Sequence, residues 1–108
     1  MKLKPIISPR SGEAVRNQFV IIDDNAIYFQ SYESVVAKLE INEPYMGKLI
    51  LGRDWDYSNT TLRWLYVFLN DYVPRYYYYI ERNYGKLCKA NIEKAIKDGI
   101  IIYNEEME

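Results

Sequence analysis

The chain has 108 residues, of which 49% are hydrophobic and 27% are charged, and its 14 basic and 15 acidic side chains leave a net charge of -1. This length and composition are typical of one folded domain and exclude a disordered chain. The near-neutral charge gives no overall attraction to nucleic acid or to an anionic membrane. Because the sequence contains no histidine, the commonest general base and metal ligand, we expect no catalytic residue, no metal site and no cofactor.

The cysteine content and the apolar runs indicate the compartment. Cys88 is the single cysteine, so it cannot form an intramolecular disulfide, whereas small secreted domains usually carry several. The apolar stretch near the N-terminus is interrupted by Pro5 and Pro9, which makes it too short for a signal peptide, and no run has the length of a membrane span. We therefore expect a cytoplasmic protein without a membrane partner.

Three regions differ in composition along the chain. Residues 1–16 contain two prolines and an excess of basic over acidic side chains, which predicts a partly ordered basic arm. Residues 17–103 carry regular hydrophobic patterns and are expected to form a single α+β domain. The last residues, 104–108, are polar and acidic, so we expect them to fray as an acidic tail.

Four strands are predicted in the first half of the domain. They are rich in β-branched and aromatic residues, and clusters of turn residues separate them. The third alternates apolar and polar residues at period two, which favours a strand over a capped helix. The predicted strands are residues 19–22, 26–29, 37–41 and 48–52, with a turn at 43–47 that contains proline and glycine. Successive strands with short connections predict an antiparallel meander.

The pattern changes to a helical period at residues 58–61, a cluster of N-cap residues before a long apolar segment. The helix that begins here places Leu62, Leu65 and Leu69 on one face, which should cover the sheet. Pro74 is expected to end or kink this helix, because proline lacks an amide hydrogen.

A second helical pattern covers residues 88–96 and ends near Gly99, which is well placed as a left-handed cap. A short strand at 100–103 should follow. These elements predict an α+β fold, in which an antiparallel meander of four to five strands is packed on one face by two or three helices.

The spacing of Asp54, Asp56 and Ser58 is similar to the beginning of a calcium-binding loop. However, Asn59 and Leu65 stand where such a loop needs glycine and a bidentate glutamate. We therefore interpret these oxygen-bearing side chains as caps for the free amides at the start of the helix.

Residues 75–86 interleave tyrosines with positive charge. If this region is largely helical, steps of three and four place five residues in one exposed stripe, a combination that suits base stacking with phosphate contact or an anchor in a protein interface. The alternative is that Tyr76, Tyr79 and Ile80 pack against the core while the charges are merely solvated. The candidate binding stripe consists of Arg75, Tyr78, Arg82, Lys86 and Lys89.

Two strings occur in the first 61 residues: Tyr28–Tyr32 (YFQSY), continued by Ser34, Val36, Ala37 and Lys38, and Trp55–Thr61 (WDYSNTT). Over roughly residues 17–70 the chain resembles a family of small uncharacterised proteins encoded by bacteriophages and other bacterial mobile elements, of which these strings are paired signatures. The family has no established activity. The resemblance therefore implies context alone, a bacterial cytoplasm and an accessory role.

We therefore expect a non-enzymatic small interaction module, an accessory protein of a phage or mobile element that binds a host or phage protein or forms a homodimer. The tyrosine excess without a catalytic set of residues favours this function. The alternative is a weak nucleic-acid-binding protein that uses the candidate stripe. No small-molecule cofactor is expected for either function.

Overall fold

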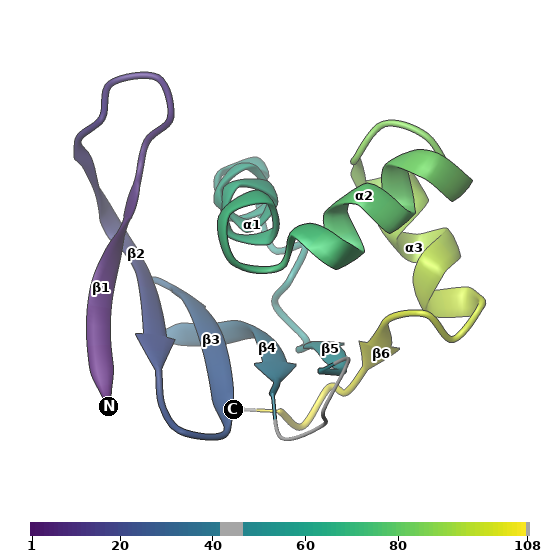
Figure 1. The fold of residues 1–108 in the computed structure, drawn as a ribbon, viewed down its shortest axis with the longest axis horizontal. Helices are drawn as coiled ribbons and strands as arrows, with labels where there is room; N and C mark the ends of the chain where they lie inside the picture. The colour runs from purple at the N-terminus through teal and green to yellow at the C-terminus, as the bar shows by residue number, and fades with distance from the viewer. Residues whose placement is uncertain (42–46, 108) are drawn as a thin grey trace.

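The structure of the protein is a computed structural model that describes residues 1–41 and 47–107 (Figure 1). The described chain forms one sheet in the order β1-β2-β3-β4-β5-β6, and three helices connect β5 to β6. Neighbouring strands from β1 to β5 are antiparallel, whereas β6 joins β5 in parallel. The elements are β1 (Lys2–Ile7), β2 (Ala14–Ile22), β3 (Ala26–Ser31), β4 (Ser34–Glu40), β5 (Leu49–Leu51), α1 (Asn59–Tyr72), α2 (Pro74–Asn83), α3 (Lys89–Lys97) and β6 (Ile102–Tyr103).

The predicted α+β class and its antiparallel meander are confirmed, and the sheet is larger than the four to five strands expected. The four predicted strands correspond to β2, β3, β4 and β5. The predicted turn at 43–47 lies, apart from Gly47, outside the described residues.

The N-terminal residues are part of the sheet, which corrects the prediction of a partly ordered arm at 1–16. β1 pairs with β2, and Pro5 is tolerated because β1 is an edge strand, where a missing amide hydrogen costs little. Ile6 is fully buried. The hairpin turn is closed by the amide of Gly12, which has a φ of +74° and donates to the carbonyl oxygen of Ser8 over 2.8 Å. Burial and strand pairing therefore outweigh a local composition that favours irregular structure.

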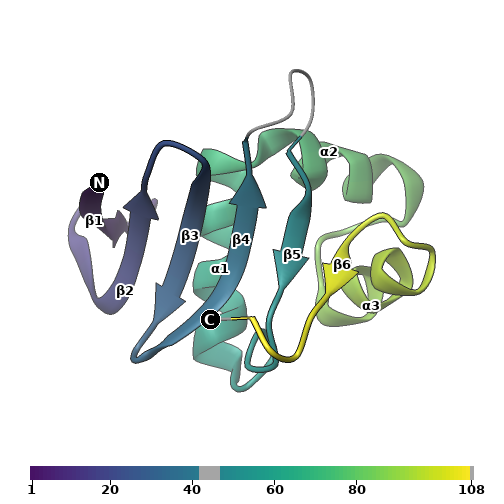
Figure 2. The same cartoon turned by 90° about the horizontal axis from the view of Figure 1, so that it is seen from below.

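The three helices lie on one face of the sheet, as predicted (Figure 2). Seen from below, α1 lies behind β3 and β4, while α2 and α3 lie behind the side of the sheet that β5 and β6 form. One face of the sheet is therefore the floor of the core, and the other face carries no helix among the described residues.

The C-terminal segment is held against the sheet as far as residue 107. This corrects the expectation that residues 104–108 fray. The amide of Asn104 donates to the carbonyl oxygen of Leu51 over 2.9 Å. Met107 is half-buried, and a Cβ at Gly52 would lie 3.2 Å from its Cε. The absence of a side chain at Gly52 therefore makes room for this segment at the end of β5.

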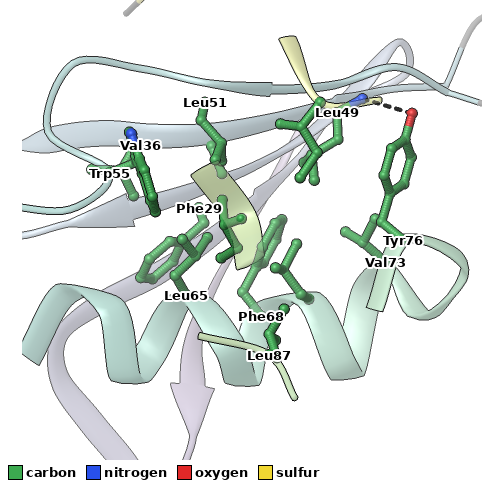
Figure 3. Close-up of a cluster of buried hydrophobic side chains, with 14 of the residues drawn as sticks. Phe29, Val36, Leu49, Leu51, Trp55, Leu65, Phe68, Val73, Tyr76 and Leu87 are labelled. Atoms are coloured by element: carbon green, nitrogen blue, oxygen red, sulfur yellow. Dashed lines mark hydrogen bonds between the residues drawn. The ribbon is translucent and has the colours of Figure 1, made fainter. Parts of the chain in front are cut away.

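The core lies between α1 and the middle strands (Figure 3). Phe29 of β3 stacks on Phe68 of α1 with ring centroids 5.5 Å apart. Because both rings are fully buried, this pair joins the helix to the centre of the sheet. The predicted apolar face of the helix is confirmed, since its three leucines are buried: Leu62, Leu65 and Leu69.

The two ends of α1 follow from local chemistry. Ser58 is the N-cap, and its Oγ accepts a hydrogen bond from the amide of Thr61 over 3.1 Å. At the other end, the predicted break at Pro74 is confirmed, because Val73 caps α1 and Pro74 is the first residue of α2. Proline suits that position, where the amide would have no partner within the helix.

The end of α3 also matches its prediction. Gly99 has a φ of +79°, which favours glycine, and it follows the last turn of the helix directly. Cys88 lies just outside the helix as its N-cap residue and is half-buried. The strand predicted at 100–103 is the shorter β6.

Tyr76 connects α2 to β5. The residue is buried, and its hydroxyl accepts a hydrogen bond from the amide of Leu49 over 3.2 Å and donates one to the carbonyl oxygen of Gly47 over 3.0 Å (Figure 3). A buried phenol with both bonds made fixes the start of β5 beneath the helix.

Replacing Leu65 with alanine should destabilise the protein by about 2–5 kcal/mol, because the cavity would lie in the centre of the core. The matched control is Arg63→Ala on the exposed side of the same helix, where the guanidinium lies 4.9 Å from the centre of the Trp64 ring. An exposed contact of this kind contributes about 0.5–1 kcal/mol. Urea unfolding of both variants measures the difference, and equal losses would contradict this orientation of α1.

Candidate functional site

The structure divides the predicted basic stripe. α2 ends at Asn83, and the chain then turns at Gly85, whose φ is +110°. Lys86 lies in this turn, and Lys89 begins α3, where its Nζ lies 3.4 Å from the Asp56 carboxylate. The assumption of one continuous helix is therefore wrong, because the glycine adopts a conformation that an α-helix cannot contain.

The tyrosines of α2 divide between core and surface. Tyr76 and Ile80 are buried, as the alternative interpretation expected, whereas Tyr79 is exposed. Of the candidate stripe, Arg75, Tyr78 and Arg82 lie exposed on α2. This short helix therefore retains three of the five candidate residues on its outer side.

A different site lies where the β3–β4 turn meets the start of α1. A pocket of about 780 Å³ opens there between exposed tyrosines. Tyr57 is 78% exposed and Tyr32 is 52% exposed, so their rings are available to a ligand. Between them the pocket is lined by hydroxyl groups from two separate parts of the chain: Ser31, Ser34, Ser58, Thr60 and Thr61.

The two signature strings meet in this pocket. Ser31 ends the first string's strand and Thr61 lies in the first turn of α1, and their hydroxyl oxygens are 3.1 Å apart in a buried contact. The sequence did not predict the pocket, because the oxygen-bearing side chains of the second string were interpreted as helix caps and the first string was assigned no site. The available signal was the repetition of hydroxyl residues in both strings, Ser31 and Ser34 in one and residues 58–61 in the other.

Hydrogen bonds hold the polar groups in place. The Ser34 hydroxyl donates to Asp54 Oδ2 over 2.9 Å, which joins the β3–β4 turn to the segment before α1. The Ser58 hydroxyl lies 3.2 Å from Thr61 Oγ1, in addition to capping the helix. The lining therefore contains two hydrogen-bonded groups, Ser34 with Asp54 and Ser31 with Thr61 and Ser58, which hold these polar side chains in place.

The backbone beside the pocket adopts uncommon conformations. Asn17 and Tyr32 have φ angles of 63° and 56°, which are rare for residues other than glycine. The amide of Tyr32 donates to the carbonyl oxygen of Asn17 over 2.7 Å, so each conformation supports the other. Such strained residues cost about 1–3 kcal/mol each and often cluster at functional sites.

A buried polar side chain lies next to Ser31 on the neighbouring strand. Gln18 is fully buried, and within residues 1–41 and 47–107 neither its Nε2 nor its Oε1 has a hydrogen-bond partner. Its register partner on β3 is Ser31, which lines the pocket. An unpaired buried amide costs about 1–3 kcal/mol, so this side chain beside Ser31 lowers the stability of the fold.

The charges around the pocket favour hydrogen-bond donors. Two carboxylates line it, those of Glu33 and Asp54, and the described residues of its lining include no lysine or arginine. A neighbouring hollow of about 700 Å³ shares both carboxylates and is bounded by Glu105, Glu106 and Arg53, whose Nε lies 3.9 Å from Asp54 Oδ1. A cation or a neutral donor therefore suits this region better than an anion.

Two kinds of function find no support in the described part of the chain. Within residues 1–41 and 47–107, no group of three or more metal-ligating side chains could hold an ion. In the same residues, no helix is both long and apolar enough to cross a membrane.

A six-stranded sheet with three helices on one face defines an α+β protein, and a pocket lined by hydroxyl groups and two exposed tyrosines lies at the start of α1. The chain belongs to a family of unknown function, DUF8033, whose model matches residues 1–94. The match extends beyond the range 17–70 that the two strings suggested and includes the β1–β2 hairpin and α2. No curated protein and no solved structure matches the chain.

The contact between Tyr84 and Asp98, which joins the end of α2 to the end of α3, should be visible by titration. The Tyr84 hydroxyl donates to Asp98 Oδ2 over 2.6 Å, and this hydrogen bond raises the pKa of Tyr84 from 10.0 to about 12. Because the folded state holds this proton more tightly, the contact stabilises the fold below pH 10 and is lost as the pH rises toward 12. The ultraviolet absorbance of tyrosinate should show one late-titrating phenol in the native chain that is missing in Tyr84→Phe.

The matched control for this titration is Asp98→Asn, which removes the carboxylate and keeps the phenol. In that variant the late step should move toward the ordinary tyrosine range, since an amide oxygen is a weaker acceptor than a carboxylate. A late step unchanged by Asp98→Asn would show that another contact causes it.

Proposed function

We propose that the chain is a non-enzymatic interaction module that binds a segment of a partner protein in the pocket at the start of α1. The observation that carries this proposal is the meeting of both signature strings, distant in sequence, in one pocket between Tyr32 and Tyr57. Exposed tyrosines beside fixed polar groups are the composition that protein interfaces use for anchoring.

The partner segment should present arginine or lysine. Glu33 and Asp54 can accept charge-assisted hydrogen bonds, and the faces of Tyr32 and Tyr57 can attract a cation. Among the described residues of the pocket lining there is no cation, and the exposed Arg53 contacts Asp54 from outside it over 3.9 Å, which leaves Glu33 as the acceptor without an ion pair to a described residue. A guanidinium satisfies both kinds of contact at once, because it is planar and carries five donors.

The biological setting is the second part of this proposal. The resemblance of the YFQSY and WDYSNTT strings to proteins of phages and mobile elements supports an accessory role in the cytoplasm of a bacterial host. The partner is then a protein of the host or of the phage.

Short peptides that differ at one central position, arginine, lysine, alanine or glutamate, test the pocket directly by fluorescence polarisation. We expect arginine and lysine peptides to bind and glutamate peptides to fail. Glu33→Gln removes one acceptor charge and should weaken binding about tenfold or more, since hydrogen bonds to charged groups contribute about 1.5–3 kcal/mol. Tyr57→Ala should weaken it about fivefold, if the ring supplies about 1 kcal/mol.

The control variant is Tyr78→Ala, which removes an exposed tyrosine from α2. It should leave peptide binding unchanged, and all three variants should keep the native melting temperature because their side chains are exposed. Equal binding of all peptides, or equal loss in all variants, would contradict the proposed site.

The alternative function, weak nucleic-acid binding through the candidate stripe, makes a separate prediction. With Lys89 paired to Asp56, contacts from Arg82 and Lys86 would give a log-log salt slope of about -1.4 for single strands, at about 0.7 per contact. Arg82→Glu combined with Lys86→Glu should then abolish the binding. We expect no measurable binding of single-stranded DNA or RNA at about 50 mM salt, and measurable binding with a slope near -1.4 would favour the alternative.

A further inference from the structure

The face of the sheet opposite the helices carries a continuous row of side chains. Residues that are partners in register lie side by side on the same face, and neighbours along a strand alternate between faces. Val20, Phe29, Ala37 and Leu51 are register partners in one buried row on the helix side of the sheet. The adjacent row therefore points away from the helices. This outer row crosses all six strands and consists of Leu3, Ile21, Tyr28, Lys38, Ile50 and Ile102.

Five of these six side chains are apolar or aromatic, and no described helix covers them. Leu3 is 66% exposed and Ile102 is 40% exposed, while Ile21, Tyr28 and Ile50 are half-buried. The C-terminal segment reaches this face beside Gly52 and crosses the end of β5 toward β4, and no described segment lies in front of β2 and β3 (Figure 2). An antiparallel sheet with one face in water normally alternates apolar and polar residues. β5 and the second half of β2, residues 19–22, are instead apolar on both faces, a pattern typical of sheets that are covered on both sides.

The charges on this face complement those of an identical face. Lys38 stands at the centre of the row, 3.6 Å from the Glu40 carboxylate on the same strand, and its Nζ lies 5.7 Å from the centre of the Tyr28 ring. When β4 packs near the two-fold axis of a symmetric pair, Lys38 of each copy can meet Glu40 of the other. A face with one cation and one anion at its centre suits its own copy better than a strongly charged partner.

The area of the face agrees with a dimer. With strands about 4.8 Å apart and about 3.3 Å per residue, six strands present roughly 500 Å². Two such faces would bury about 1,000 Å² in total, which reaches the lower limit of specific interfaces. We propose that a second copy of the chain covers this face, so that two sheets pack face to face in a symmetric dimer. None of the six outer-row residues lines the peptide pocket, so this proposal does not depend on the pocket.

Sedimentation equilibrium of the full chain tests the dimer. The native chain should reach twice its 12.9 kDa mass and should dissociate on dilution. Leu3→Lys and Ile102→Lys, at opposite edges of the row, should together raise the dissociation constant about tenfold or more, because each places a charge in an apolar contact. The matched control is Tyr78→Lys, which adds the same charge at an exposed aromatic residue of α2 and should leave the mass unchanged.

The two edge substitutions replace exposed side chains, so the variant should keep the native circular dichroism spectrum and remain a valid test if a central substitution such as Ile50→Lys fails to fold. A native chain that stays monomeric up to about 200 µM, far above a micromolar dissociation constant, would overturn the proposal. A dimer that persists in the edge variant would also overturn it, as would a monomer that uses this face to bind lipid vesicles. Glu33→Gln and Tyr57→Ala should not change the mass, which separates failure of the dimer from failure of the peptide pocket.

Discussion

The packing of α1 across the middle of the sheet is the contact on which the rest of the structure depends. Phe68 stacks on Phe29 of β3, and Leu65 fills the space beside them. Because the sheet can bury one face under a single layer of helices, this contact determines which row of each strand becomes core. It also brings the N-terminus of α1 to the β3–β4 turn, where the hydroxyls of Ser31 and Thr61 meet. The candidate pocket is therefore a consequence of the same packing that forms the core.

Several features around the pocket reduce stability and are retained nevertheless. Asn17 and Tyr32 hold left-handed backbone conformations, and the amide of Gln18 is buried without a partner among the described residues. Each costs on the order of 1 kcal/mol or more. All three lie close to the pocket, since Asn17 and Tyr32 line it and Gln18 follows Asn17 on β2. Their cost in stability is consistent with the binding site proposed there.

The protein presents three surfaces with different chemistry. The pocket lining carries hydroxyl groups and two carboxylates, the outer side of α2 carries Arg82 and exposed tyrosines, and the face of the sheet opposite the helices is mainly apolar with one central ion pair. These differences are invisible in the net charge of -1, because charges of opposite sign gather at different places. A near-neutral chain can therefore still offer a distinctly acidic pocket.

The sequence by itself determined the local elements. The period-two strands, the Ser58 cap, the break at Pro74 and the left-handed Gly99 each depend on residues a few positions apart, so their patterns can be read along the chain. Tertiary structure decided the rest. Burial of Ile6 stabilises an edge strand where the local composition predicted irregular structure. The turn at Gly85 divides the candidate stripe, which was predicted on the assumption of one continuous helix. The pocket could not be predicted because its two halves meet through contacts between distant segments, which no local pattern encodes.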